Sequence, residues 1–141
     1  MNMNKAVMLF LLTLTGSVSN IFCQSSYYTH WYNFYNEEYI DFHTYGIVKL
    51  KEFYGPPNFG ETPSIDKIEY HYVFILLEPI TFKKELEIVT VEEIQLIFPN
   101  GIKKEIEDGG GYIIEGRLFF AETGHHHTPV ILIVNRIAVN G

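Results

Sequence analysis

Runs of β-branched and aromatic residues, separated by stretches rich in glycine and proline, restrict this chain to strands joined by turns. Within residues 40–50, the apolar side chains of Ile40, Phe42 and Val48 fall on one parity and the charged side chains fall on the other. A repeat of two residues with all charges on one side is typical of a half-buried strand. Further runs of this kind span residues 68–77, 87–98, 112–120 and 130–139.

Residues that favour turns lie between these runs. Residues 53–64 are rich in proline and glycine, which excludes a central strand there. Glu78-Pro79 is expected to interrupt the second run. Asn100-Gly101 predicts a hairpin turn, because Asn-Gly tolerates the positive φ angles of tight turns. Residues 108–111 (Asp-Gly-Gly-Gly) predict another reversal.

Five strands and no convincing helix predict an all-β fold. Residues 82–93 are the best candidate for a helix, but the run Val89-Thr90-Val91 favours a strand. Gly46, within the first run, predicts a bend or bulge of the kind that closes small barrels. We therefore predict a small OB-like five-stranded barrel within residues 40–141, with a β-sandwich as the alternative.

The composition agrees with one strand-rich domain. The chain has 141 residues, enough for a single modest core, and it contains ten Tyr and eleven Phe. Its 10 Lys and Arg residues against 17 Asp and Glu residues give a formal net charge of −7. Such a surface repels nucleic acid unless basic residues are segregated, and the sequence offers only Lys83-Lys84 and Lys103-Lys104. We therefore expect no nucleic-acid partner.

The first 23 residues are typical of an export signal. Lys5 precedes an apolar run over residues 6–14, which has the length of a signal peptide and is too short for a permanent membrane span. Cleavage is expected after Ser19 or after Cys23. The minority alternative is lipidation of Cys23, which is the only case in which we expect membrane attachment.

Cys23 is the only cysteine, so the mature domain is expected to lack an internal disulfide. Exported bacterial domains often lack disulfides, whereas small extracellular eukaryotic domains usually contain them. The sequence therefore predicts a periplasmic or secreted bacterial protein. Residues 24–39 are aromatic and polar without a clear period, and we expect them to form a strap across the domain.

Several blocks of the sequence resemble a known bacterial family. They are the loop Gly55-Pro-Pro-Asn-Phe-Gly-Glu61, Asp66, residues 72–80 ending in Leu-Glu-Pro-Ile, Ile94-Gln-Leu96, and Gly116-Arg-Leu-Phe-Phe120 followed by Thr123-Gly-His-His-His-Thr-Pro-Val130. Together they resemble domain of unknown function 4431, roughly over residues 46–137. The aromatic N-terminal segment and residues 100–111 depart from the family pattern. The resemblance implies a secreted or periplasmic bacterial protein and implies no particular activity.

The three consecutive histidines are the most distinctive part of that last block. Side chains alternate sides in an extended segment, so His125 and His127 are expected to face together and His126 to face away. Two imidazoles at this spacing can share a divalent metal ion, but a tight site needs further ligands. His71, Asp66 and Glu122 are candidates if the fold brings them close. The alternative is that the histidines hold the turn by bonding its backbone and stacking on aromatic rings.

A ligand site of another kind is also compatible with this fold. In an OB-like barrel the first and last loops, here residues 55–66 and 122–129, flank one binding face. Such a face would receive an unknown protein, glycan or small ligand. The candidate side chains for such a site are Tyr70, Tyr72, Asn58 and Thr128, with a structural role as the alternative for the tyrosines.

Catalysis has less support in the sequence. There is no nucleophile elbow, phosphate loop or paired-cysteine motif. A histidine general base with Glu115 or Asp66 remains conceivable, because imidazole titrates near neutral pH. We therefore expect a small exported binding or interaction module with a His-rich loop. A metal-binding protein that uses His125 and His127 is the alternative, and a metal- or His-dependent hydrolase follows it.

Overall fold

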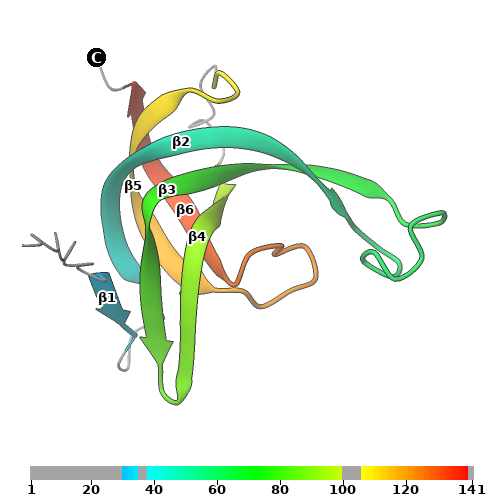
Figure 1. Cartoon of the computed structure of the whole chain (residues 1–141), viewed down its shortest axis with the longest axis horizontal. Coiled ribbons are helices and arrows are strands. Elements are labelled where there is room, and N and C mark those ends of the chain that lie inside the picture. Colours follow the sequence, from blue (N-terminus) through cyan, green and yellow to red (C-terminus); the bar gives the residue numbers. More distant parts are fainter. Residues whose placement is uncertain (1–29, 35–37, 100–105, 140–141) are drawn as a thin grey trace, which may run out of the picture.

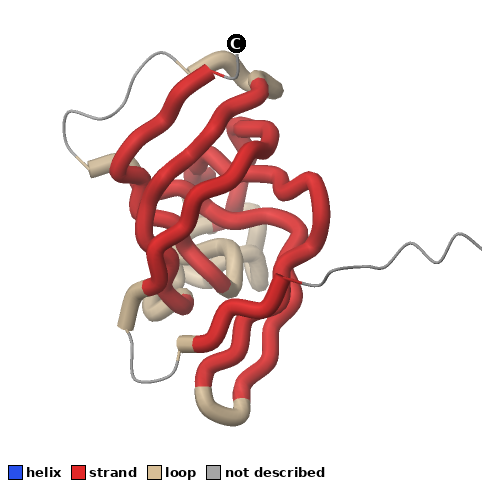
Figure 2. Tube along the Cα trace, turned by 90° about the vertical axis from the view of Figure 1, so that its left-hand side faces the viewer, coloured by secondary structure: helices blue, strands red, loops and turns tan. Residues whose placement is uncertain are grey.

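The described part of the computed structural model comprises residues 30–34, 38–99 and 106–139. Throughout these residues the regular structure is β-strand, as the sequence predicts, and none of it forms a helix long and apolar enough to cross a membrane (Figures 1 and 2). The strands are β1 (His30–Asn33), β2 (Ile40–Tyr54), β3 (Ile68–Lys84), β4 (Glu87–Ile97), β5 (Gly111–Phe120) and β6 (Val130–Val139).

The six strands form one sheet whose hydrogen bonds close on themselves. The order is β1-β3-β2-β5-β6-β4, and β4 also pairs with β3. Five strands therefore form a closed ring, and β1 lies outside the ring in parallel with β3. Within the ring the pairs are antiparallel except β4 with β6. This ring is compatible with the OB-like barrel and with the sandwich alternative.

Two departures from the expected strands concern β1 and β3. Residues 30–33, in the segment expected to be a strap, form a sixth strand beside residues 80–83 of β3. Strand β3 continues through Glu78-Pro79 instead of stopping there. Its pairing with β4 shifts between Ile75 and Ile80, and such an irregularity accommodates a proline that cannot donate to the ladder.

Gly46 allows the strands of the ring to approach closely. It is buried and pairs with both β3 and β5, without a shift of register at this position. A Cβ atom here would lie 2.5 Å from the carbonyl oxygen of Ile75 and 2.6 Å from the Phe74 ring. Of the two alternatives predicted for Gly46, a bend or a bulge, the register shows no bulge, and β2 curves as one long ribbon (Figure 1).

The core lies inside the ring and is built from the inward-facing residues of β2 to β6, with Tyr32 of β1 packed against it. Phe74, Phe82, Ile94, Ile114, Leu118 and Leu132 are among its fully buried members. Phe34, which follows β1, is also buried there and packs edge-on against Phe120. The end of β1 therefore shares the core of the ring.

The outer halves of β2 and β3 form a hairpin arm that projects from the ring (Figure 1). Residues 55–67 connect the two strands at the far end of this arm. The loop between β5 and β6, residues 121–129, returns along the same side of the molecule. The arm and this loop contain the motif-like blocks of the sequence, so their contacts define the candidate site.

Candidate functional site

One carboxylate organises the loop at the end of the arm. The side chain of Asp66 accepts hydrogen bonds from the backbone N–H groups of Asn58 at 2.7 Å, Gly60 at 2.8 Å and Thr62 at 3.3 Å. Asp66 is 9% exposed, so water competes little for these bonds. The loop therefore has a defined shape, and it presents Phe59 at its surface.

The β5–β6 loop is held by His126 and Thr128. The Nδ1 atom of His126 accepts hydrogen bonds from the backbone N–H groups of Glu122 at 2.9 Å and Thr123 at 3.3 Å. Burial lowers the pKa of His126, which favours the neutral imidazole that this acceptor role requires. The Thr128 hydroxyl accepts from the backbone N–H of Gln95 and donates to the carbonyl of Val130. His126 and Thr128 thus have the turn-holding role that was weighed for this loop.

The two loops touch each other. The ring of Phe59 packs edge-on against His125, with their centroids 5.9 Å apart. A Cβ atom added to Gly124 would lie 2.7 Å from the same phenylalanine ring. The expectation that the first and last loops border one region is therefore met.

Three imidazoles converge on the carboxylate of Glu69 in this region. The nearest oxygen of Glu69 lies 2.8 Å from Nδ1 of His125, 3.1 Å from Nε2 of His127 and 3.4 Å from Nε2 of His71. We call Glu69, His71, His125 and His127 the histidine cluster. Glu69 and His71 are two positions apart on β3 and share a face, because strand side chains alternate. His125 and His127 meet them from the loop, while His126 faces the loop backbone, as the alternation predicts.

The cluster is only partly open to solvent. The side chains of His127, Glu69 and His71 are 10%, 20% and 27% exposed, whereas that of His125 is 58% exposed. Phe53 stacks on the imidazole of His127, with centroids 4.5 Å apart and planes 9° apart. Three members therefore have constrained positions, and His125 lies at the solvent side.

The electrostatics of the cluster follow from these contacts. Hydrogen bonds from His125, and then from His127 and His71, lower the pKa of Glu69 from 4.5 to about 2, although burial acts in the opposite direction. Glu69 is therefore a carboxylate at any physiological pH. It supplies negative charge at a point where three imidazole nitrogens converge.

Gln95 lies behind the cluster and joins its members. Its Oε1 accepts from the backbone N–H of His127 at 2.6 Å, and its Nε2 donates to the carbonyl of His125 at 3.0 Å. The same Nε2 lies 3.2 Å from Nδ1 of His71. Gln95 is 2% exposed, so this buried amide fixes the loop to β3 and β4.

The arrangement has the chemistry of a metal site. One ligand atom each from Glu69, His71 and His127 lies within 4.8 Å of the other two. Imidazole nitrogen and carboxylate oxygen are common ligands of zinc and of other divalent transition metals. His125 lies outside this group of three, but it contacts the other oxygen of the same carboxylate and is therefore a further candidate ligand beside it.

The ligand candidates Tyr70 and Tyr72 do not join this cluster. They alternate with Glu69 and His71 along β3 and lie on its other face. Tyr70 is 62% exposed, and its hydroxyl donates to Glu52. Tyr72 packs against the core and lies edge-on to Phe98.

The other sequence candidates are divided between loop architecture and separate surfaces. Asn58 and Asp66 bond each other in the arm loop, and Thr128 holds the β5–β6 loop. Glu122 is exposed and contributes its backbone N–H to His126. Glu115 lies 3.8 Å from His43 and 3.6 Å from Arg136, so it is not a partner of the histidine cluster. Of the sequence candidates, the fold brings His71, His125 and His127 into the histidine cluster.

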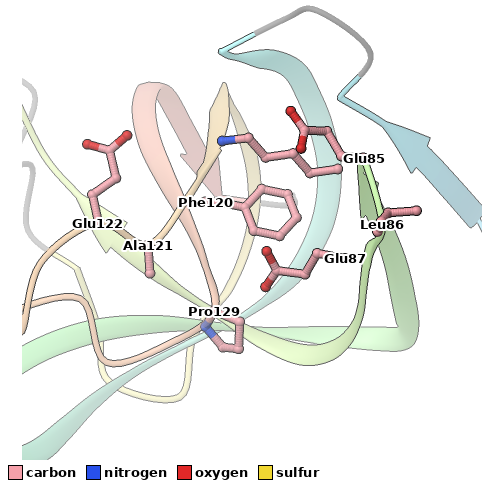
Figure 3. A pocket seen from close by; sticks show the side chains of 8 residues that line it. Glu85, Leu86, Glu87, Phe120, Ala121, Glu122 and Pro129 are labelled. Atoms are coloured by element: carbon pink, nitrogen blue, oxygen red, sulfur yellow. The ribbon is translucent and has the colours of Figure 1, made fainter.

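A separate cavity of about 450 Å³ lies between the β3–β4 turn and the two ends of the β5–β6 loop (Figure 3). The side-chain nitrogen of Lys84 lies 5.6 Å from the centre of the Phe120 ring, which faces this space. Its lining consists of Lys84, Glu85, Leu86, Glu87, Phe120, Ala121, Glu122 and Pro129. None of these residues belongs to the histidine cluster, so the cavity is a distinct feature.

Glu69 and Gln95 were not recognised from the sequence. The signal for Glu69 was its place two residues before His71 in an alternating strand, which puts both side chains on one face. Gln95 lies in the block Ile94-Gln-Leu96 that contributes to the family resemblance, but nothing near it in the sequence indicates its role. Its role depends on contacts with residues about thirty positions away.

The family resemblance is confirmed over the C-terminal part of the chain. Residues 93–138 match the model of the family described as Domain of unknown function (DUF4431). The match includes Gln95 and the entire β5–β6 loop with its three histidines. Comparison with curated proteins and with solved structures yields no match.

Proposed function

We propose that this protein binds a divalent transition-metal ion between the arm and the β5–β6 loop. The observation that carries the proposal is the convergence of three imidazoles on the Glu69 carboxylate. His127 and Glu69 are the central pair, because their side chains are the least exposed of the four and their atoms are 3.1 Å apart. His71 and His125 approach the same carboxylate from different sides and are candidates for the remaining positions.

Zinc is the first ion to test. It accepts mixed nitrogen and oxygen ligands in a tetrahedral arrangement, and neutral imidazoles with one carboxylate provide such a set. Nickel and copper also bind imidazole and differ in preferred geometry, so they serve as comparisons. The sequence predicts a small binding module, and we propose that the ligand of this module is a metal ion.

The test is metal content and thermal unfolding of untagged mature protein, with and without zinc, nickel and copper. Zinc at one hundred times its dissociation constant would stabilise the fold by about 2.7 kcal/mol. We expect His127→Ala to abolish this shift. His43→Ala is the matched control, because it removes an exposed histidine that also lies near a carboxylate, that of Glu115. Absence of a shift in the unmodified protein, or its survival in His127→Ala, would contradict the proposal.

We also propose that the protein acts outside the cytoplasm of a bacterial cell, in the periplasm or after secretion. The support is the lysine-led apolar run of residues 5–14, which lies outside the described residues. A metal site made of histidine and glutamate suits that compartment, because it contains no thiol that an oxidising environment would convert to a disulfide.

A further inference from the structure

The orientation of the Gln95 amide is determined by its backbone partners. The N–H of His127 can only donate, so the amide atom 2.6 Å from it is the oxygen. The carbonyl of His125 can only accept, so the amide atom 3.0 Å from it is the nitrogen. Exchange of the two amide atoms would leave both backbone groups opposite the wrong partner in a buried position.

This orientation determines the tautomer of His71. The amide nitrogen of Gln95 carries two hydrogens, and the second one faces Nδ1 of His71 at 3.2 Å. Nδ1 must therefore offer its lone pair, and a neutral His71 carries its hydrogen on Nε2. That Nε2–H points to the carboxylate of Glu69 at 3.4 Å.

A nitrogen that carries hydrogen cannot bind a metal ion. If Nε2 of His71 bound the ion, its hydrogen would have to move to Nδ1, where it would oppose the N–H of the buried Gln95 amide. Among the described residues, no comparable amide faces the second ring nitrogen of His125 or His127. Nδ1 of His125 and Nε2 of His127 also donate to Glu69 in the metal-free protein. Their hydrogens can move to the second ring nitrogen, because no amide in the described part of the chain opposes them there, so both histidines can present a lone pair to the ion.

We infer that Gln95 makes His71 a hydrogen-bond donor that positions Glu69, and that the metal ligands are Glu69, His125 and His127. This inference rests on the proposed metal binding for its ligand set. Ligating carboxylates are commonly oriented by hydrogen bonds of this kind. Three protein ligands leave a further coordination position for water or another small donor at the exposed His125 side.

The first test is nuclear magnetic resonance of the imidazole nitrogens in the full mature chain labelled with ¹⁵N. In metal-free protein near neutral pH, we expect His71 to show hydrogen on Nε2 and a free lone pair on Nδ1. With zinc added, we expect metal-induced shifts at Nδ1 of His125 and Nε2 of His127, while Nε2 of His71 keeps its hydrogen. Hydrogen on Nδ1 of His71, or zinc on its Nε2, would overturn the inference.

The two proposals fail in different ways in this experiment. If zinc does not bind, the proposed function is wrong and the ligand set is overturned with it. The tautomer of His71 is measured without metal and decides the role of Gln95 by itself.

The second test compares variants by zinc affinity. His71→Ala is expected to weaken zinc binding about tenfold, the low end of the range for groups that orient a ligand. His71→Gln keeps an N–H donor and is expected to restore most of the loss. His127→Gln is expected not to bind, because an amide does not replace a ligating imidazole. Equal losses in His71→Gln and His127→Gln, with metal-free melting unchanged, would assign His71 as a ligand.

Discussion

Glu69 illustrates how one residue on β3 depends on groups that are remote in the sequence. Its carboxylate is surrounded by His71 from its own strand and by His125 and His127 from another loop. These donors lower its pKa to about 2, although burial alone would raise it. The low pKa of Glu69 therefore depends on tertiary contacts.

The lowered pKa of Glu69 predicts a specific acid dependence of metal-free stability. In the folded protein this pKa is about 2, below its ordinary value of 4.5. The contribution of the ionised Glu69 carboxylate to the free energy of unfolding is therefore complete above pH 4.5, and it is lost as the pH falls toward 2. We expect Glu69→Gln to be less stable than the unmodified protein at pH 5, with the difference shrinking toward pH 2. Urea unfolding at a series of pH values checks this, and a difference that does not depend on pH would contradict it.

At the scale of elements, the arm and the β5–β6 loop form the site together. Asp66 gives the end of the arm its shape by accepting three backbone hydrogen bonds. Phe59 from that loop then packs against His125. The Pro/Gly block and the His-rich block of the sequence are thus two halves of one structural unit, although only the second lies within the family match.

Removal of the Asp66 carboxylate should loosen this unit without altering a ligand. Asp66→Ala leaves three backbone donors without their acceptor, and we expect a loss of about 1–3 kcal/mol in stability. Asp66→Asn keeps one acceptor oxygen and should lose less. Urea unfolding of the two variants, with zinc affinity measured in parallel, checks this ranking. Equal stability of Asp66→Ala and the unmodified protein would show that the loop does not depend on this carboxylate.

At the scale of the whole molecule, export and metal binding make one consistent proposal. Within the described residues, 30–34 with 38–99 and 106–139, β2 to β6 form a closed ring, β1 pairs along its outside, and all contribute to or pack against one core. The proposed site lies outside that core, on the arm and loop. The fold can therefore form from its apolar contacts, and the metal would then join two elements that already touch.

Export predicts a shortened N-terminus. When the full gene product is made in a bacterium with a periplasm, we expect the mature protein outside the cytoplasm to begin at Asn20 or Gln24. N-terminal sequencing together with intact mass distinguishes these sites from lipidation of Cys23, which would add the mass of the acyl groups. Accumulation in the cytoplasm with residues 1–23 intact would contradict export.

Most strands could be predicted because the features that define them lie within a few residues of one another in the sequence. Alternation over residues 40–50 and the turn residues at 108–111 are features that neighbouring positions reveal by themselves. Which side each histidine of the loop faces also follows from this local rule. In contrast, β1 has no clean period, and its assignment depends on an available edge of β3.

The sequence by itself therefore determined the all-β class and most of the strands. It also determined that His125 and His127 face the same side of their loop. Only the tertiary structure decided that β3 continues past Pro79, that Tyr70 and Tyr72 face away from the cluster, and that Glu69 and Gln95 complete it. The physical reason is the range of the interactions involved. Alternation acts between adjacent residues, whereas the hydrogen bonds of Glu69 to His125 and His127 span 56 and 58 positions and exist only after the ring has closed.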